Sequence, residues 1–215
     1  MRPTSSLRRL GLVLLFILLA FVGLVSWMVV MPGRSYDRPT PRLSAADVEV
    51  AATLRRHVVF LAQAVGPRSV WGGGLPPAVE YLSRTIRGIG CAPVLHTYEI
   101  SGTSVSNVEV EVRGSTLPDE IVIVGAHYDS VDESPGADDN ASGVAAVLEL
   151  LRITKRVRPA RTIRFVFFVN EEPPYFQTER MGSLVYADRS RARGEDIIAM
   201  LSVESIGFFS DDEGS

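Results

Sequence analysis

The feature that most constrains this chain is a long apolar run near its start, because no charged residue occurs from Leu10 to Met31. At a rise of about 1.5 Å per residue, a helix over this run is long enough to cross a hydrocarbon layer of about 30 Å. A buried core helix is a poor alternative, since an unbroken apolar run has no polar face to offer water. The run therefore predicts a transmembrane helix over residues 10–31.

The flanks of this run favour an uncleaved anchor over a signal peptide. Residues 27–32 read Trp-Met-Val-Val-Met-Pro and lack the small-x-small exit of a cleaved segment. Arginines precede the run, which favours a cytoplasmic location for residues 1–9, although the arginines that follow it weaken the asymmetry. We therefore expect a single-pass protein of the cell membrane whose folded part lies on the extracytoplasmic side.

The rest of the chain has the composition of one folded domain. Of its 215 residues, 46% are hydrophobic and 22% are charged, which is enough to supply a core. Proline-rich residues 32–43 are typical of a linker, so the domain is expected over residues 44–215. A net charge of −3 without a basic stripe argues against nucleic acid as a partner. Cys91 is the only cysteine, so any metal would be held by histidine and carboxylates.

Apolar periodicity predicts an α/β fold. Ser44 can cap a helix that runs to about Gly66, and a second helix is expected over 77–88. Alternating residues predict two antiparallel strands, and longer apolar runs predict three buried strands with a helix over 141–153 between the first two. The five strands are expected over 93–100, 106–112, 121–124, 163–169 and 197–206. Together they predict a three-layer sandwich whose central sheet is mostly parallel, with an antiparallel edge.

Polar residues gather where the three buried strands end, which is the usual position of functional groups in open α/β sheets. Each of the three strand ends carries side chains that could bind a metal, which chance would rarely arrange. These residues are His127, Asp129, Asp139, Glu171, Glu172 and Glu204.

Taken singly, each of these groups has an ordinary structural explanation. A lone histidine at a strand end is more often a hydrogen-bonded residue than a ligand, and Asp-Asp-Asn before a helix is usually a cap. The adjacent Glu171 and Glu172 are harder to explain, because two carboxylates repel each other unless a cation or a shared proton intervenes. His57 and His96 are interpreted as structural, since the sequence around them offers no partner ligands.

Three motifs together resemble the family of co-catalytic zinc aminopeptidases. They are His-Tyr-Asp-Ser over 127–130, Gly-Ala-Asp-Asp-Asn-Ala-Ser-Gly over 136–143 and Asn-Glu-Glu over 170–172. Relatives of this family include bacterial leucyl and Streptomyces-type aminopeptidases, glutamate carboxypeptidase and glutaminyl cyclase. The resemblance covers residues 48–207 and implies the phosphorylase/hydrolase-like zinc-peptidase fold.

The resemblance implies a site for two zinc ions. His127 would bind one ion and Asp139 would bridge both, while Glu172 would bind the first ion and Glu204 the second. A cis peptide bond is expected between Asp139 and Asn140, because it aims the bridging carboxylate.

The resemblance also implies the catalytic roles. Glu171 would be the general base that takes a proton from the metal-bound water and returns it to the leaving amine. Asp129 would accept the other ring N–H of His127 and fix its tautomer. The expected substrate is a peptide with a free N-terminus.

Two departures from the family pattern are visible. Glu204 stands where many members have aspartate, and residues 173–183 replace a shorter turn, either as a reshaped substrate pocket or as a surface loop. In the family, the second metal takes a histidine much further along, and no histidine follows His127 here. We therefore expect a domain that is incomplete at its C-terminus and that, alone, binds substoichiometric zinc with little activity.

The resemblance leaves three functions open. The first is a membrane-anchored zinc exopeptidase of the aminopeptidase type. The second is a glutaminyl-cyclase-like transferase that uses a single zinc, and the third is a non-catalytic binding module on the same fold. A serine hydrolase is disfavoured because the chain has no Gly-x-Ser-x-Gly elbow.

Overall fold

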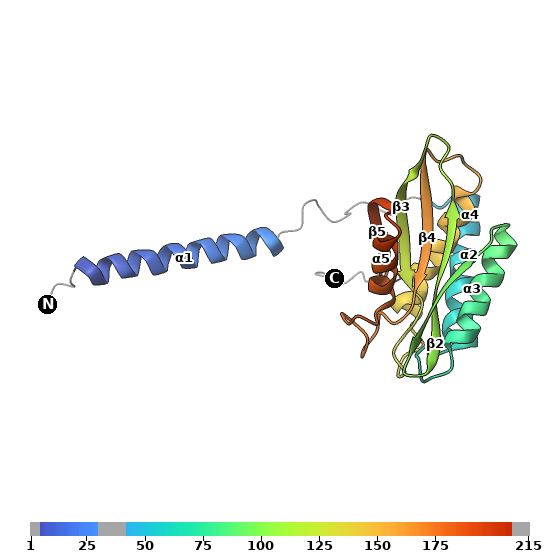
Figure 1. Ribbon diagram of the computed structural model, residues 1–215, viewed down its shortest axis with the longest axis horizontal. Coiled ribbons are helices and arrows are strands. Elements are labelled where there is room, and N and C mark those ends of the chain that lie inside the picture. Colours follow the sequence, from blue (N-terminus) through green and yellow to red (C-terminus); the bar gives the residue numbers. More distant parts are fainter. Residues whose placement is uncertain (1–4, 30–41, 208–215) are drawn as a thin grey trace. The chain divides into compact units, whose positions relative to one another are not determined.

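The computed structural model describes residues 5–29 and 42–207, and the chain divides into two compact units between residues 42 and 43. The first unit contains α1 (Ser5–Val29), drawn in blue in Figure 1. Its part from Arg8 to Val29 has a mean hydropathy of 2.8 and is long enough to cross a membrane. A helix of this kind near the N-terminus is a signal sequence or an anchor. Most of the predicted linker over 32–43 lies outside the described residues.

The second unit begins with two helices that follow the predicted pattern. α2 (Ala45–Val59) is capped by Ser44, whose hydroxyl accepts the Asp47 N–H at 3.2 Å while the Asp47 carboxylate accepts the Ser44 N–H at 2.8 Å. The helix continues as the π-helical segment η1 (Phe60–Val65), which was not predicted. α3 (Leu75–Ile89) follows and ends at Gly90.

Five strands form one mixed sheet in the order β1-β2-β4-β3-β5. Within it, β1 pairs antiparallel with β2 and β2 with β4, whereas β3 is parallel to both β4 and β5. The α/β class is confirmed, but a mostly parallel sheet is wrong for the described residues, because the β1–β2 hairpin adds two antiparallel pairings beside β4. The strands are β1 (Val94–Ile100), β2 (Thr103–Val112), β3 (Leu117–His127), β4 (Arg161–Phe168) and β5 (Asp196–Ser202).

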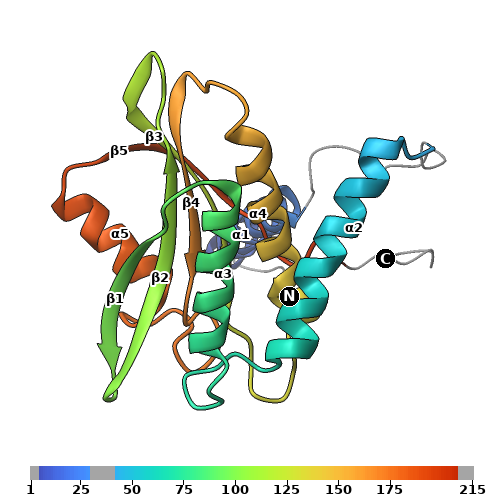
Figure 2. The same ribbon diagram turned by 90° about the vertical axis from the view of Figure 1, so that its right-hand side faces the viewer.

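Helices cover both faces of this sheet (Figure 2). Alternate residues of β4 point to opposite faces, as expected for a strand. Phe165 and Phe167 join the main core under α3 and α4 (Gly143–Thr154), while Val166 and Phe168 join a smaller core that includes Tyr186 of α5 (Gly182–Ala192). The sheet is therefore held between two apolar layers of unequal size.

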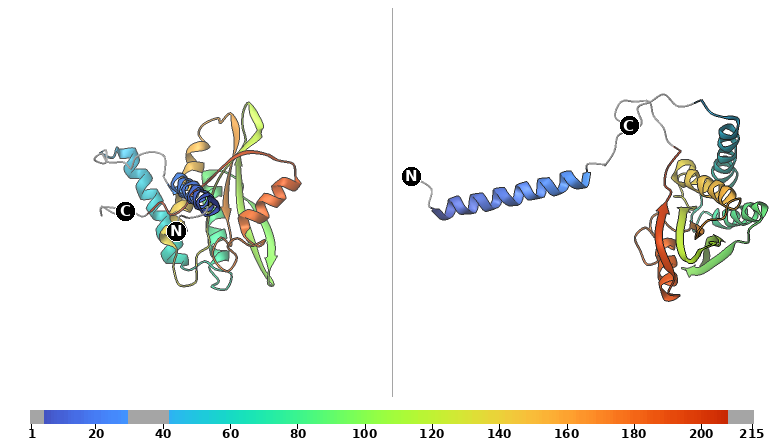
Figure 3. Two further views of the ribbon diagram at one scale, coloured as in Figure 1. Left: turned by 90° about the vertical axis from the view of Figure 1, so that its left-hand side faces the viewer. Right: turned by 90° about the horizontal axis from the view of Figure 1, so that it is seen from above.

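The last strand is shorter and more exposed than predicted. β5 ends at Ser202, so the residues up to 206 are not strand, and most of its side chains are exposed. The right-hand view of Figure 3 shows β5, in red, at the edge of the sheet. The expectation of a buried strand is wrong here because, among the described residues, β5 pairs only with β3.

Candidate metal centre

The carboxyl ends of three parallel strands bring the predicted residues together. β3 ends at His127, β4 is followed by Glu171 and Glu172, and β5 is followed by Glu204, while Asp139 lies in η2 (Ala137–Ser142). Ligand atoms of two groups lie within 4.8 Å of one another: His127 with Glu171 and Glu172, and His127 with Asp139 and Glu204. We call these five residues and Asp129 the strand-end cluster.

The imidazole of His127 is the centre of this cluster. Its side chain is 2% exposed, and its Nε2 lies 3.0 Å from Asp139 Oδ1 and 3.1 Å from Glu204 Oε1. Glu171 Oε2 lies 3.9 Å from the same nitrogen. One nitrogen thus faces carboxylates that come from three different segments of the chain.

Without a bound cation, the crowded carboxylates favour protonation of His127 and of the neighbouring glutamates. Burial lowers the pKa of His127, but the carboxylates of Asp129 and Glu204 outweigh it and raise the pKa to about 11. Burial and then the charge of Asp139 raise the pKa of Glu172 to about 7, and burial also raises the pKa of Glu171. Imidazole and carboxylate are ligands that zinc accepts, so the residues fit a divalent cation in place of these protons.

Asp129 lies beside His127 but holds a different partner than expected. Its Oδ1 is 3.4 Å from His127 Nδ1, and that buried nitrogen has no hydrogen-bond partner within the described residues. The carboxylate instead accepts the backbone N–H of Glu171 at 3.2 Å and that of Glu172 at 3.1 Å. Asp129 therefore joins the end of β3 to the glutamate pair that follows β4.

The loop that carries Asp139 is fixed by its neighbour. The peptide bond between Asp139 and Asn140 is cis, as expected. The fully buried Asn140 accepts N–H groups of Gly143 at 2.9 Å and Ser205 at 3.3 Å, and it donates to the Val203 carbonyl at 2.9 Å. Asn140 thereby ties the Asp139 loop to the segment that holds Glu204, a role that the sequence motif did not reveal.

Arg68 is a second residue that the sequence did not reveal. It is fully buried, and its guanidinium donates to the carbonyls of Tyr128 at 2.6 Å, Pro135 at 2.6 Å and Gly136 at 2.9 Å. These carbonyls belong to the loop between His127 and Asp139. Burial lowers the pKa of Arg68 to about 10, against the opposing charges of Asp129 and Asp139. A lone arginine between turn residues carries no sequence signal for this role.

His57 and His96 lie outside both groups of candidate ligands, as expected. His57 Nδ1 is 2.6 Å from the Tyr81 hydroxyl. His96 does have an acidic partner, since its Nε2 is 2.9 Å from Glu109 Oε2, so its surroundings were wrongly predicted to lack one. The partner comes from the neighbouring strand β2, which the local sequence does not indicate.

Glu109 belongs to another buried group, which we call the Arg164 cluster. The Arg164 guanidinium lies 3.5 Å from Glu109, 3.0 Å from Glu111 and 2.9 Å from Glu195. The Tyr186 hydroxyl donates to Glu109 at 2.6 Å. In this cluster every carboxylate contacts the guanidinium.

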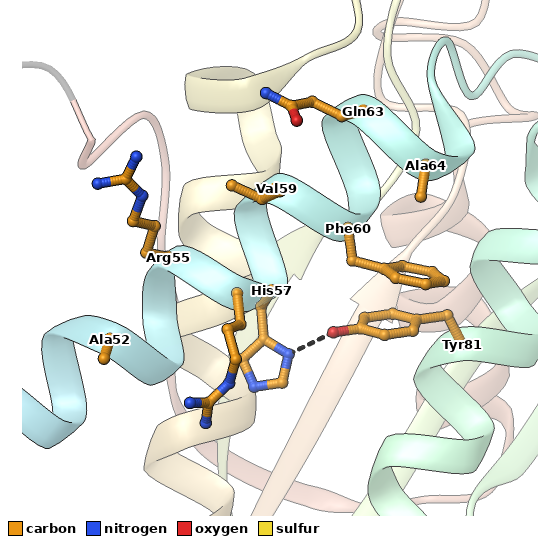
Figure 4. A pocket seen from close by; sticks show the side chains of 9 residues that line it. Ala52, Arg55, His57, Val59, Phe60, Gln63, Ala64 and Tyr81 are labelled. Carbon is orange, nitrogen blue, oxygen red and sulfur yellow. Dashed lines mark hydrogen bonds between the residues drawn. The ribbon is translucent and has the colours of Figure 1, made fainter.

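A hollow of about 1000 Å³ lies away from the candidate ligands. It is an open groove beside α2 and η1, and Figure 4 shows Phe60 stacked on Tyr81 within it. None of the strand-end residues lines it. The size of this groove therefore says nothing about the chemistry at the strand ends.

Known proteins are similar to this chain in sequence and in fold. The model of peptidase family M28 matches residues 107–213, and the chain belongs to this family. It is 30% identical over 209 residues to the uncharacterized protein YfbL of Escherichia coli, a match that covers 93% of this chain and 60% of YfbL. It is 33% identical over 120 residues to the probable aminopeptidase YDR415C of Saccharomyces cerevisiae, covering 50% of this chain and 31% of that protein.

Solved structures share the fold. The aminopeptidase from Aneurinibacillus sp. strain AM-1 superposes with a TM-score of 0.63 at 15% identity, covering 73% of this chain and 70% of that one. The glutaminyl cyclase of Porphyromonas gingivalis superposes with a TM-score of 0.61 at 24% identity, covering 78% and 61%. The chain thus spans less than two thirds of the length of YfbL, YDR415C and the cyclase.

Proposed function

We propose that this protein is a zinc-dependent exopeptidase of the aminopeptidase type, which acts on peptides with a free N-terminus. The observation that carries the proposal is the meeting of His127, at the end of β3, with carboxylates that follow β4 and β5 and with Asp139 of η2. In this proposal α1 is a membrane anchor and the second unit is the peptidase domain on the extracytoplasmic side.

Four residues would hold the metal. His127 and Glu172 are assigned to one zinc ion, Glu204 to the other, and Asp139 to both. Bound zinc would supply Lewis acidity toward the peptide carbonyl and would lower the pKa of water at the site. Asp139 Oδ1 and Glu204 Oε1, both close to His127 Nε2, support a common metal centre, and the division between two ions is what the family resemblance implies.

Glu171 is assigned as the general base. Its side chain is one third exposed, so substrate and water can reach it, and burial raises its pKa toward neutral pH, which suits a group that accepts and returns a proton. In this role it takes a proton from the attacking water and delivers it to the leaving amine. Its position is held by the bond between its own N–H and Asp129.

The exposed carboxylates of the cluster favour a cationic substrate end. The side chains of Asp139 and Glu204 are 59% and 48% exposed. Negative charge on the open side of the site would attract a protonated α-amino group and repel a C-terminal carboxylate. This supports cleavage at the N-terminal end of a peptide.

A glutaminyl-cyclase-like transferase with a single zinc is the second candidate. The similarity in fold to the Porphyromonas gingivalis enzyme favours it. The two candidates differ in product and in metal content. A transferase would convert an N-terminal glutaminyl peptide to its cyclised form without releasing the N-terminal residue.

Replacement of Glu171 by glutamine tests the proposal. In a protein that carries the complete domain, Glu171→Gln should lower turnover of L-leucine p-nitroanilide by about 10²–10⁴-fold, with zinc per chain unchanged, because it removes a base and not a ligand. The matched control is Glu133→Gln, which replaces an exposed glutamate outside the cluster and should leave both turnover and zinc content unchanged. Near-normal turnover in the Glu171 variant would show that the base is misassigned, and cyclised product without released leucine would favour the transferase.

A further inference from the structure

Arg68 is a buried cation without an acidic partner among the residues that the structure describes. Its side-chain contacts are all backbone carbonyls, and besides those of Tyr128, Pro135 and Gly136 it donates to Leu61 at 3.1 Å and Gly66 at 3.0 Å. A buried guanidinium is costly unless it is well hydrogen-bonded, so this geometry is specific. Arg68 joins η1 and the turn after it to the loop that lies between His127 and Asp139.

The contact with Gly136 leads directly to Asp139. The Gly136 carbonyl accepts Arg68 Nη2 at 2.9 Å and also the Ala141 N–H at 3.1 Å, which closes the turn that contains Asp139. Gly136 has a φ of +55°, and a Cβ there would lie 2.7 Å from Arg68 Nη2 and would crowd the Asp139 carbonyl. One carbonyl is therefore fixed from both sides at the entrance to the turn.

The backbone of Arg68 fixes the other end of the same loop. The Arg68 N–H donates to Ser130 Oγ at 3.0 Å, and the Ser130 N–H donates to the Arg68 carbonyl at 3.1 Å. Ser130 follows Asp129, which holds the backbone of Glu171 and Glu172. Arg68 thus contacts both the start and the end of the segment that separates His127 from Asp139.

We propose that Arg68 is a positioning residue that sets the distance between His127 and Asp139 and so prepares the strand-end cluster to bind zinc. It acts through the loop and does not touch the metal ligands themselves. Lysine cannot replace it fully, because an ammonium has three donors and lacks the planar fork that reaches carbonyls on separate segments. The proposal rests on the proposed zinc site, but its test measures zinc affinity and does not depend on activity.

The test compares two buried arginines. Arg68→Met and Arg164→Met are made in the full chain in detergent micelles, and the zinc dissociation constant is measured by competition with a chromogenic chelator, alongside circular dichroism. We expect Arg68→Met to weaken zinc binding about 10–100-fold, the range for residues that orient metal ligands, and Arg68→Lys to lie between it and the parent chain. Arg164→Met should leave the constant within about twofold. Equal zinc affinity in Arg68→Met and the parent chain would overturn the proposal, as would equal losses in both arginine variants.

Lysine variants keep the test sharp if Arg68→Met does not fold. Arg68→Lys keeps the buried positive charge but loses the planar fork that reaches carbonyls on separate segments, and Arg164→Lys is the matched control. Only Arg68→Lys should weaken zinc binding, by about 3-fold or more, and equal effects of the two lysines would overturn the proposal. A protein with the complete domain that binds zinc but hydrolyses nothing would defeat the proposed function and leave this inference standing. A parent chain that binds no zinc would overturn both.

Discussion

The strand-end cluster and the Arg164 cluster both gather carboxylates around one basic side chain, yet they differ in how charge is balanced. Arg164 contacts three glutamates with five donors, and its charge does not depend on pH in the range where proteins fold. Among the residues that the structure describes, His127 is the only base in contact with the strand-end cluster, and it carries charge only when protonated. One cluster contains its own cation, and the other offers candidate ligands to a cation from solution.

The largest expected effect is the loss of stability when Arg164 is replaced. Arg164→Met leaves Glu109 buried without its counter-charge, so the free energy of unfolding should fall by about 3–5 kcal/mol, the range for breaking a buried pair. Zinc should not restore it, because His96, whose Nε2 lies 2.9 Å from Glu109, belongs to no group of three candidate metal ligands among the described residues. Urea unfolding of the full chain, with and without zinc, measures the free energy of unfolding and the effect of zinc on it. If zinc restored the free energy of unfolding, the Arg164 cluster would also accept a cation from solution, and the two clusters would not differ in this respect.

The next prediction concerns Asp129, which orders the ligands of the strand-end cluster. Asp129→Asn removes an acceptor from the backbone of Glu171 or Glu172, so zinc affinity should fall about 10–100-fold. Chelator competition measures the constant. Asp119→Asn, an exposed aspartate in β3, is the matched control and should leave it unchanged. A loss in the control of the same size would point to net charge as the cause.

These contacts also show how far the sequence could predict the molecule. The βαβ unit and the meeting of the candidate ligands at the strand ends could be predicted, because the apolar runs and the motifs after them are local in the chain. The place of β2 beside β4, which makes the sheet mixed, could not be predicted, since antiparallel pairing within a hairpin does not specify the outer neighbour. Arg68 and Asn140 were missed for the same reason: the partners that define their roles lie 60 residues or more away.

The smallest prediction is that the zinc-free clusters respond to pH in opposite directions. Glu172 has a folded pKa raised to about 7 by burial and Asp139, so its contribution to stability is present below pH 4.5 and is lost as pH rises through 7. Burial raises the pKa of Glu195, but Arg193 and Arg164 outweigh it and lower the pKa to about 2. Its contribution is present above pH 4.5 and is lost as pH falls through 2.

Unfolding midpoints of the zinc-free chain from pH 2 to 8 test these two slopes. In a plot of the unfolding midpoint against pH, Glu172→Gln should reduce the slope between pH 4.5 and 7, and Glu195→Gln should reduce the slope below pH 4.5. With zinc present, stability should instead increase with pH over the upper range, because zinc binding displaces protons from the same ligands. If Glu172→Gln left the slope between pH 4.5 and 7 unchanged, Glu172 would not be the group that causes the loss of stability in this range.

The position of bound zinc tests the central claim most directly. A crystal of the full chain grown with zinc, with diffraction recorded on both sides of the zinc absorption edge, locates the ion independently of the protein atoms. The account predicts an anomalous peak about 2.0–2.1 Å from His127 Nε2, within reach of Asp139 and one of the cluster glutamates. A peak at His57 or His96 with none at His127, or no ordered zinc at all, would contradict it.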